Sequence, residues 1–367
     1  MSLRAPPIRP LHLLPDETLK EITLIRPDDW HVHFRDGSIL ADVVPASAAR
    51  FGRVVVMPNL VPPVTTAAAA QAYRKRILSV VPDHPSFDPL MALYLTESTT
   101  PKEVGDAARS GADHDCPVIG FKFYPAGATT HSDRGVHDIT RCNAALEAMQ
   151  AQGLALLIHG EVVSEEVDVF DRERIFVEEV LAPLAERFPG LKIVLEHVTT
   201  AEGVDFVRDA RKGVAATITA HHLLLNRNAL FEGGLRPHHY CLPTLKRERH
   251  RLALVEAATS GSERFFLGTD SAPHPKNAKE SACGCAGIYT AHAAIELYAE
   301  VFEQTGKLDR LEAFASRNGP CFYKLPVNEE RMVLRKKAWS VPEEMPIGEE
   351  SLVPFRAGDE VAWRIAS

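Results

Sequence analysis

The chain has 367 residues, of which 45% are hydrophobic and 25% charged, a composition typical of a folded globular protein rather than a disordered or fibrous one. Its formal net charge is −8 at pH 7 and it has no long basic run, so we expect no nucleic-acid partner. No stretch has the apolar length of a membrane helix or a signal peptide, and the six scattered cysteines suggest reduced thiols. The sequence therefore predicts a cytoplasmic protein without a membrane partner.

Short apolar runs typical of buried strands alternate with longer helix-like segments. The predicted strands are 22–25 leading to Trp30, 54–57, 90–95, 118–123, 154–158, 193–195, 215–219 and 265–267. The predicted helices are 41–50, 66–80, 101–109, 139–152, 172–187, 201–211, 247–258 and 286–305. Eight strand–helix units over roughly 250 residues predict an α/β fold of the (β/α)8 TIM-barrel type. A doubly wound open sheet is the alternative, which the lack of a glycine-rich phosphate motif after the first strand disfavours.

Three segments follow from this pattern. Residues 1–20 are predicted to be an N-terminal extension, and residues 21–325 the barrel. Residues 326–367 are strand-prone and interrupted by prolines, so we expect a C-terminal extension that packs on the barrel rather than a separate domain.

Polar side chains that can bind metals, protons or anions follow six of the eight predicted strands. They are His31, His33, Arg35, Asn59, Lys122, His159, His197, Asp270 and His274. The carboxyl ends of all strands in a barrel open on one face, so we expect these side chains to share one mouth. Each alone has an ordinary structural explanation, such as a hydrogen-bonded loop histidine, but their joint placement favours a functional site.

The residue types in this set indicate a metal centre. His31 and His33 lie two residues apart, so on a strand they point to the same side and can bind one ion together. Imidazoles with one carboxylate suit Zn²⁺ better than Mg²⁺ or Ca²⁺. Four histidines and Asp270 make five candidate ligands, whereas a catalytic zinc ion with an open position has three protein ligands. This number of candidate ligands favours two ions. A protonated Lys122 beside two dications would be repelled, so this lysine must be neutral or modified, for example as a carbamate.

Seven short motifs along the chain form a recognisable set. They are HVHFRDG (31–37), MPN (57–59), KFYPA (122–126), EHVTT (196–200), RPHHYCLP (236–243), GTDSAPHP (268–275) and KESACGCAG (279–287). Together they resemble the amidohydrolase superfamily, and within it the shorter, class II dihydroorotases. The resemblance runs from about residue 23 to the C-terminus.

This resemblance implies a zinc hydrolase that interconverts N-carbamoyl-L-aspartate and L-dihydroorotate in pyrimidine (UMP) biosynthesis. It implies two Zn²⁺ ions per subunit, bridged by a carboxylated Lys122 and a hydroxide, and it implies a homodimer. The other ligands would be His31, His33 and Asp270 on one ion, and His159 and His197 on the other. Asp270 would also be the catalytic residue that carries a proton to the leaving nitrogen.

The resemblance also implies which groups meet the substrate. The side chains of Arg35, Asn59 and His274 would bind its carboxylate. The backbone of Leu242 and Ala286 would bind its ring amides. Thr129 and Thr130 would lie on a mobile loop that closes over the substrate.

Two other functions stay open. One is a different cyclic-amide hydrolase, of the hydantoinase or allantoinase kind, although a neutral hydantoin offers Arg35 and Asn59 no carboxylate to bind. The other is an inactive barrel that acts as a structural partner, although none of the implied metal ligands is missing. We interpret Cys283 and Cys285 as inert thiols of a tight loop, and the pairs 221–222 and 238–239 as histidines of loops or of the surroundings of the site.

Overall fold

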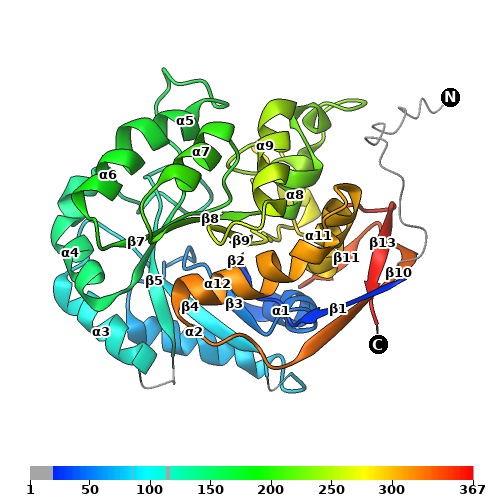
Figure 1. The fold of residues 1–367 in the computed structure, drawn as a ribbon, viewed down its shortest axis with the longest axis horizontal. Helices are drawn as coiled ribbons and strands as arrows, with labels where there is room; N and C mark the ends of the chain where they lie inside the picture. The colour runs from blue at the N-terminus through cyan, green and yellow to red at the C-terminus, as the bar shows by residue number, and fades with distance from the viewer. Residues whose placement is uncertain (1–19, 85, 113–115, 367) are drawn as a thin grey trace.

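Eight parallel strands form a barrel at the centre of the computed structural model (Figure 1). The structure describes residues 20–84, 86–112 and 116–366, so the predicted N-terminal extension lies outside the described residues except for Lys20. Each barrel strand pairs in parallel with the next one along the chain. The strands are β2 (Asp29–Val32), β3 (Arg53–Val56), β4 (Asp88–Tyr94), β5 (Val118–Phe123), β6 (Ala155–Ile158), β7 (Lys192–Leu195), β8 (Val214–Ile218) and β9 (Phe265–Leu267).

The first and last strands meet at their carboxyl ends, which excludes the open sheet. Val32 forms a parallel bridge with Ser271, just beyond β9. The amide of His33 donates to the carbonyl of Ser271 at 3.0 Å, and the amide of Asp270 donates to the carbonyl of His31 at 2.8 Å. The predicted TIM-type barrel is therefore confirmed, and the bonds that close it involve the predicted metal ligands.

Alternate residues of each strand face opposite sides, as the pleat of a strand requires. Val55 and Leu90 belong to a cluster with buried residues from seven of the eight strands, and Ile119 of β5 packs against it, so this cluster fills the inside of the barrel. Val54 and Val56 belong instead to the larger core between the strands and the outer helices. Both faces of the sheet are covered, which explains why the strands are continuous apolar runs.

Helices cover the outside of the barrel (Figure 1). The α-helices in the described residues are α1 (Leu40–Ala48), α2 (Ala67–Ser79), α3 (Pro101–Ala112), α4 (Asn143–Gln152), α5 (Arg172–Phe176), α6 (Ala182–Arg187), α7 (Ala201–Asp209), α8 (Ala220–Leu224), α9 (Glu248–Thr259), α10 (Lys276–Lys279), α11 (Ala294–Gln304) and α12 (Asn318–Tyr323). Shorter helical turns are η1 (Gly37–Ile39), η2 (Ile139–Cys142), η3 (Val177–Leu181), η4 (Arg227–Leu230), η5 (Pro237–His239), η6 (Ala291–Ala293), η7 (Leu308–Arg310) and η8 (Ala313–Arg317). The predicted helix 172–187 is one continuous helical segment whose middle, η3, is a π-helical turn.

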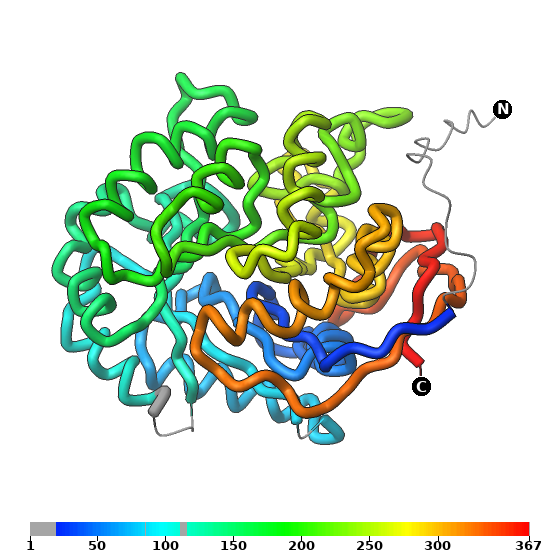
Figure 2. The backbone as a smooth tube through the Cα atoms, viewed as in Figure 1, coloured from blue at the N-terminus to red at the C-terminus, as the bar shows by residue number. Residues whose placement is uncertain are grey.

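The prediction for the first strand was wrong in one respect. Residues 21–25 do not lead into the barrel but form β1 (Glu21–Ile25), which pairs antiparallel with β10 (Arg331–Ser340). Figure 2 shows these two segments side by side although they lie at opposite ends of the chain. Pro27, which has no amide hydrogen, separates β1 from the true first barrel strand, β2.

The C-terminal strands form two small sheets beside the barrel. β10 lies between β1 and β13 (Glu360–Ile365), while β11 (Met345–Ile347) pairs with β12 (Glu350–Leu352). The sheet of β13 contacts α11, because the amide of Ala362 donates to Glu300 at 2.7 Å and the indole of Trp363 donates to Glu303 at 3.1 Å.

The helix predicted from residue 286 begins later than expected. Residues 286–288 are extended, and Ile288 forms a parallel bridge with Ser271. The helix proper starts at Ala294 after the turn η6. This extended segment matters for the site, because it keeps Ala286 beside the end of β9.

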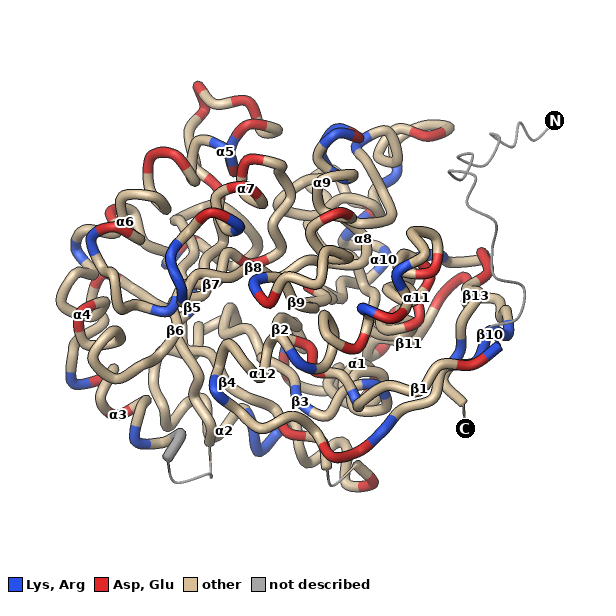
Figure 3. The backbone as a smooth tube through the Cα atoms, in the orientation of Figure 1, with Lys and Arg blue, Asp and Glu red and all other residues tan. Residues whose placement is uncertain are grey.

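Basic and acidic residues are mixed along the outer helices and the C-terminal strands (Figure 3). Within the described ranges, no helix has both the length and the apolar character needed to cross a membrane.

Candidate metal centre and substrate site

A small cavity at the carboxyl ends of the barrel strands brings together all but two of the predicted site residues. It is lined by His31, His33, Arg35, Asn59, Tyr124, Thr129, Thr130, His159, His197, Leu242, Asp270, Ala272, Ala286 and Gly287. Its volume is about 20 Å³, which is room for about one water molecule. The two predicted residues outside the lining are Lys122, buried on β5, and His274, which contacts Arg35.

His31, His33 and Asp270 form the tightest group in the cavity. The two Nε2 atoms of the histidines lie 3.4 Å apart, and they lie 3.3 and 3.2 Å from Oδ1 of Asp270. A tetrahedral ion with bonds of about 2.1 Å needs ligand atoms roughly 3.4 Å apart, so this spacing fits one metal ion. Burial alone would raise the pKa of the Asp270 carboxyl, but the hydrogen bonds with both histidines hold it well below its usual range.

Glu196 fixes the orientation of His31. Its Oε2 lies 2.9 Å from Nδ1 of His31 and also accepts a hydrogen bond of 2.6 Å from the hydroxyl of Thr217. A carboxylate can only accept, so Nδ1 of His31 carries a proton, and Nε2 is directed toward Asp270 and the cavity, where a metal ion would take the place of the proton on this atom. A histidine held in this way is prepared to bind a metal.

His159 and His197 stand beside this group. The ring of His197 lies 5.0 Å from that of His31 and 4.9 Å from that of His159, measured between centroids. Nε2 of His159 lies 2.8 Å from Glu161. Burial lowers the pKa of His197 well below its usual value, so its imidazole is neutral, as a metal ligand must be.

Lys122 is buried in the middle of this cluster. Its Nζ makes no hydrogen bond with any residue that the structure describes, and it lies 5.1 Å from the centre of the Tyr124 ring. Burial lowers the pKa of Lys122 to about 8, against the opposing effect of Glu196 and Asp270. At this pKa roughly one tenth of the amine is neutral near pH 7, and the neutral amine is the form that can react with CO₂.

Arg35 and His274 place a positive charge on the other side of the cavity. Nη2 of Arg35 lies 2.8 Å from Nε2 of His274, and its Nε donates to the carbonyl of Pro273 at 3.2 Å. No carboxylate forms a salt bridge with this guanidinium in the described part of the chain, so it is available to an anionic ligand. Nε2 of His274 also lies 3.0 Å from the carbonyl oxygen of Ala286.

Three of the residues in the cavity have backbone conformations that L residues rarely adopt. The φ angles of Arg35, His197 and Asp270 are 61°, 41° and 45°. Such strain costs roughly 1–3 kcal/mol per residue and is concentrated at functional sites. Its presence at a predicted anion contact and two predicted metal ligands supports a functional site here.

The predicted mobile loop lies directly over the cavity. The side chain of Asn59 donates to the carbonyl of Thr130 at 3.0 Å, and the hydroxyl of Thr130 reaches the carbonyl of Ala286 at 3.5 Å. Ser132 ties the base of the loop, because its hydroxyl accepts from the amide of Thr129 at 2.8 Å and donates to the carbonyl of Thr129 at 2.6 Å. With the loop in this position the cavity has room for about one water molecule and not for a substrate.

Sequence reasoning missed several residues that support the site. Glu196 directly precedes the predicted ligand His197, and Glu161 follows the predicted ligand His159 by two residues, so their position beside these histidines was a usable signal. Glu173 had no such signal: it is fully buried and accepts hydrogen bonds from the amides and hydroxyls of Thr199 and Thr200. It therefore holds the chain just after the predicted ligand His197.

Two other features lie apart from this cavity. His221, His222 and Cys241 form a second buried group, and the two histidines lie on α8 rather than on a loop.

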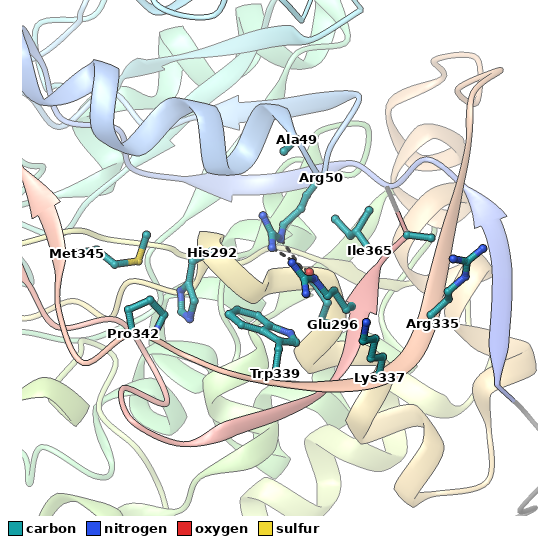
Figure 4. A pocket seen from close by; sticks show the side chains of 12 residues that line it. Ala49, Arg50, His292, Glu296, Arg335, Lys337, Trp339, Pro342, Met345 and Ile365 are labelled. Atoms are coloured by element: carbon teal, nitrogen blue, oxygen red, sulfur yellow. Dashed lines mark hydrogen bonds and ion pairs between the residues drawn. The ribbon is translucent and has the colours of Figure 1, made fainter.

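A larger cavity of about 580 Å³ lies between the end of α1, α11 and the C-terminal strands (Figure 4). It contains none of the predicted site residues, and an ion pair of 2.8 Å between Arg50 and Glu296 spans it.

Comparison with known proteins identifies the family. The model of the amidohydrolase family matches residues 22–338. A dihydroorotase from Aromatoleum aromaticum is 64% identical over 348 residues, which cover 95% of this chain and 100% of that protein. The crystal structure of dihydroorotase from Campylobacter jejuni has a TM-score of 0.86 at 35% identity, covering 97% of this chain and 99% of that one.

A dihydroorotase from Saccharomyces cerevisiae, solved in complex with 5-fluoroorotic acid, has a TM-score of 0.84 at 34% identity and covers 95% of this chain and 99% of that one. These matches extend over nearly the whole length of both proteins in each comparison. The chain belongs to the amidohydrolase family and, within it, to the dihydroorotases.

Proposed function

We propose that this chain catalyses the reversible cyclisation of N-carbamoyl-L-aspartate to L-dihydroorotate and water, a step of pyrimidine biosynthesis. The observation that carries this proposal is the pairing of two features in one cavity. The cluster of His31, His33 and Asp270 suits a hydrolytic metal, and the guanidinium of Arg35 suits a carboxylate. Both substrates of a dihydroorotase carry a carboxylate that does not react, separated from the reacting carbonyl carbon by two carbon atoms.

The enzyme is metal-dependent, and we propose two Zn²⁺ ions. His31, His33 and Asp270 would hold one ion, because their ligand atoms lie within 4.8 Å of one another. His159 and His197 would hold the other, and both are buried and adjacent to the first group. Metal ions in such a site lower the pKa of a bound water molecule and polarise the carbonyl that is attacked.

We propose further that Lys122 carries a carbamate that bridges the two ions. Its neutral amine would attack the carbon of CO₂, form the N–C bond and release a proton to water, leaving one negative charge shared by two oxygens. The buried Nζ without a hydrogen-bond partner among the described residues supports this modification. An unmodified ammonium here would face two dications at close range.

The side chains of the cavity then have separate tasks. Arg35, Asn59 and His274 would bind the substrate carboxylate, and the backbone of Leu242 and Ala286 would hold the ring amides. In the hydrolytic direction, water adds to the ring carbonyl and the C–N bond breaks. Asp270 would accept the proton from that water and pass it to the leaving nitrogen. Thr129 and Thr130 would contact the substrate when the loop closes and excludes bulk water.

A panel of cyclic amides tests this function against the hydantoinase alternative. The zinc-loaded protein should hydrolyse L-dihydroorotate and cyclise N-carbamoyl-L-aspartate, and it should act poorly on hydantoin, dihydrouracil and allantoin, because these compounds lack the carboxylate for Arg35. Faster turnover of a neutral ring than of dihydroorotate would contradict the proposal. A protein with both metals bound and no activity on any member would support the inactive-barrel alternative.

Replacing Arg35 by methionine should weaken the binding of both substrates. The loss of a buried charge-assisted contact costs roughly 2–4 kcal/mol, so kcat/KM should fall on the order of 10²-fold or more while the metal content stays unchanged. Steady-state kinetics and metal analysis of the purified variant measure both. As a control, Arg76→Met removes an exposed arginine that pairs with Asp36 and should leave kcat/KM unaltered. A wild-type kcat/KM in Arg35→Met would rule out this contact.

Shortening the loop tests its role as a lid. A deletion of residues 127–131 should lower kcat by at least roughly 10²-fold, because the substrate would stay exposed to water, while the bound metal should change little. The double variant Thr129→Ala/Thr130→Ala keeps the length of the loop and should lose less activity than the deletion. Full kcat in the deletion variant would show that the loop is no lid.

We also propose that the protein works in the cytoplasm as a homodimer. All six cysteines are free, including the buried Cys116, Cys142 and Cys241, as is usual in a reducing compartment. The resemblance to dihydroorotases supports the dimer. Light scattering coupled to gel filtration gives the mass directly, and a mass near that of one 40.4 kDa chain would contradict it.

A further inference from the structure

Lys279, at the end of α10, is a buried lysine for which the proposed mechanism gives no role. Its side chain is 5% exposed, and its Nζ donates hydrogen bonds to the carbonyl oxygens of Tyr240 (3.0 Å), Cys285 (3.0 Å) and Gly287. An ammonium group has three N–H donors, so all of them are used. Lysine is rarely buried to this extent without a carboxylate partner. Within the described ranges Lys279 has no carboxylate partner, and the three carbonyl oxygens accept its hydrogen bonds instead.

These three carbonyls belong to the two segments that carry the proposed backbone contacts with the substrate. Tyr240 precedes Leu242 by two residues, and Cys285 and Gly287 flank Ala286 on both sides. The segments also touch directly, because the amide of Gly287 donates to the carbonyl of Tyr240 at 3.0 Å. The ammonium of Lys279 therefore joins two stretches of chain that are separated by about forty residues in sequence and lie side by side at the cavity.

Neither segment has a regular helix or strand to hold it in place. Residues 240–243 and 284–287 lack helical or strand structure, so no regular ladder of backbone hydrogen bonds fixes their carbonyl and amide groups. Gly287 has a φ of +148°, and a Cβ at this position would lie only 2.8 Å from the carbonyl oxygen of Ala272. The segment 284–287 is therefore in close contact with the residues that follow β9. Moving it by a few tenths of an ångström would displace Ala286 together with His274, whose Nε2 lies 3.0 Å from the Ala286 carbonyl.

We propose that Lys279 is a positioning residue, which holds the backbone of Leu242 and Ala286 at the separation that the ring amides of the substrate require. This inference rests on the proposed function. Lys279 lines neither the metal cluster nor the cavity itself, so it acts on substrate binding through the two segments rather than on the metals or the reacting carbon. Its removal should therefore weaken the binding of ground state and transition state alike, which raises KM more than it lowers kcat.

The variant Lys279→Met tests this directly, because methionine fills similar space without any N–H donor. In the zinc-loaded enzyme, KM for N-carbamoyl-L-aspartate and for dihydroorotate should rise by roughly 10- to 100-fold, since three hydrogen bonds of a charged donor are lost. We expect kcat to stay within about threefold of wild type and the metal content to be unchanged. The inhibition constant of orotate, a planar product analogue, should rise in parallel with KM. Lys276→Met is the matched control, because Lys276 lies on the same short helix, pairs with Glu344 on the surface and should have no effect.

A second variant keeps the test decisive if Lys279→Met does not fold. Lys279→Gln retains two N–H donors on a shorter side chain, and its KM should lie between those of wild type and the methionine variant. Unchanged KM in either folded variant would overturn the inference. So would a joint loss of kcat and metal with KM preserved, because that result describes a purely structural lysine. A wild-type protein without dihydroorotase activity would overturn the proposed function and this inference with it, whereas an active wild type with unaltered variants overturns this inference alone.

Discussion

Replacing Lys122 by alanine should remove most of the bound metal and nearly all activity. Without the lysine no carbamate can form, so the two proposed zinc ions lose the ligand they share and the centre loses one negative charge between two dications. We expect kcat to fall by at least roughly 10³-fold, and metal analysis of the purified variant to give well below two ions per chain. Lys192→Ala is the control, because Lys192 stands at the first position of β7, at the opposite end of the barrel, and should change neither quantity.

Chemical rescue makes this prediction specific for a carbamate. Small carboxylic acids such as acetate or propionate can enter the space left by the Lys122 side chain and supply the two missing oxygens. Activity and metal content should then recover together, in proportion to the concentration of the acid. A Lys122→Ala enzyme that keeps two zinc ions and normal turnover would remove Lys122 from the metal centre.

Replacing Asp270 by asparagine should abolish proton transfer while leaving the shape of the site nearly intact. Asp270 is the only carboxylate in the proposed metal shell, and its pKa is held well below the usual range by His31 and His33 in spite of its burial. It is therefore ionised in the metal-free protein at neutral pH and able to accept a proton. Removing a general acid–base typically costs 10²- to 10⁴-fold, and a lost ligand adds to this, so kcat should fall by at least roughly 10³-fold in both directions.

The same residue predicts opposite pH dependences for the two directions. Hydrolysis of dihydroorotate needs Asp270 ionised at the start, so its rate should rise with pH. Cyclisation passes through the same transition state in reverse and needs the carboxyl protonated, so its rate should fall as pH rises. The apparent pKa belongs to Asp270 and the metal-activated water together. Initial rates in both directions across roughly pH 5 to 9 measure this, and loss of kcat on the same side in both directions would contradict the proton-carrier role.

The sequence was sufficient to predict the barrel and the clustering of the candidate site residues at one of its ends. Strands buried on both faces must be apolar throughout, so runs such as 54–57 and 193–195 could be recognised without knowing their partners. Because all strands are parallel, the residues that follow them meet at one end. This is why His31, His159 and Asp270, which are far apart in the chain, line one cavity.

The parts that could not be predicted depend on contacts between distant segments. Nothing local distinguishes β1 from a barrel strand, because its partner β10 lies about 300 residues further along the chain. Glu173 is likewise ordinary in the sequence of a helix, and only the fold brings Thr199 and Thr200 to its carboxylate. The helix predicted from residue 286 starts only at Ala294, because Ile288 pairs with Ser271, beyond the end of β9, and this pairing prevails over local helix preference.

Titration of the metal-free protein with zinc tests the central claim most directly. Zinc is added stepwise in the presence of bicarbonate, and both the bound metal and the rate of N-carbamoyl-L-aspartate cyclisation are measured at each step. Activity should be absent at the start, rise with added metal and saturate when two ions are bound per chain, and the saturated rate should fall when CO₂ and bicarbonate are excluded before the metal is added. Full cyclisation activity with no metal, or saturation at one ion without any need for CO₂, would contradict a two-metal dihydroorotase bridged by Lys122.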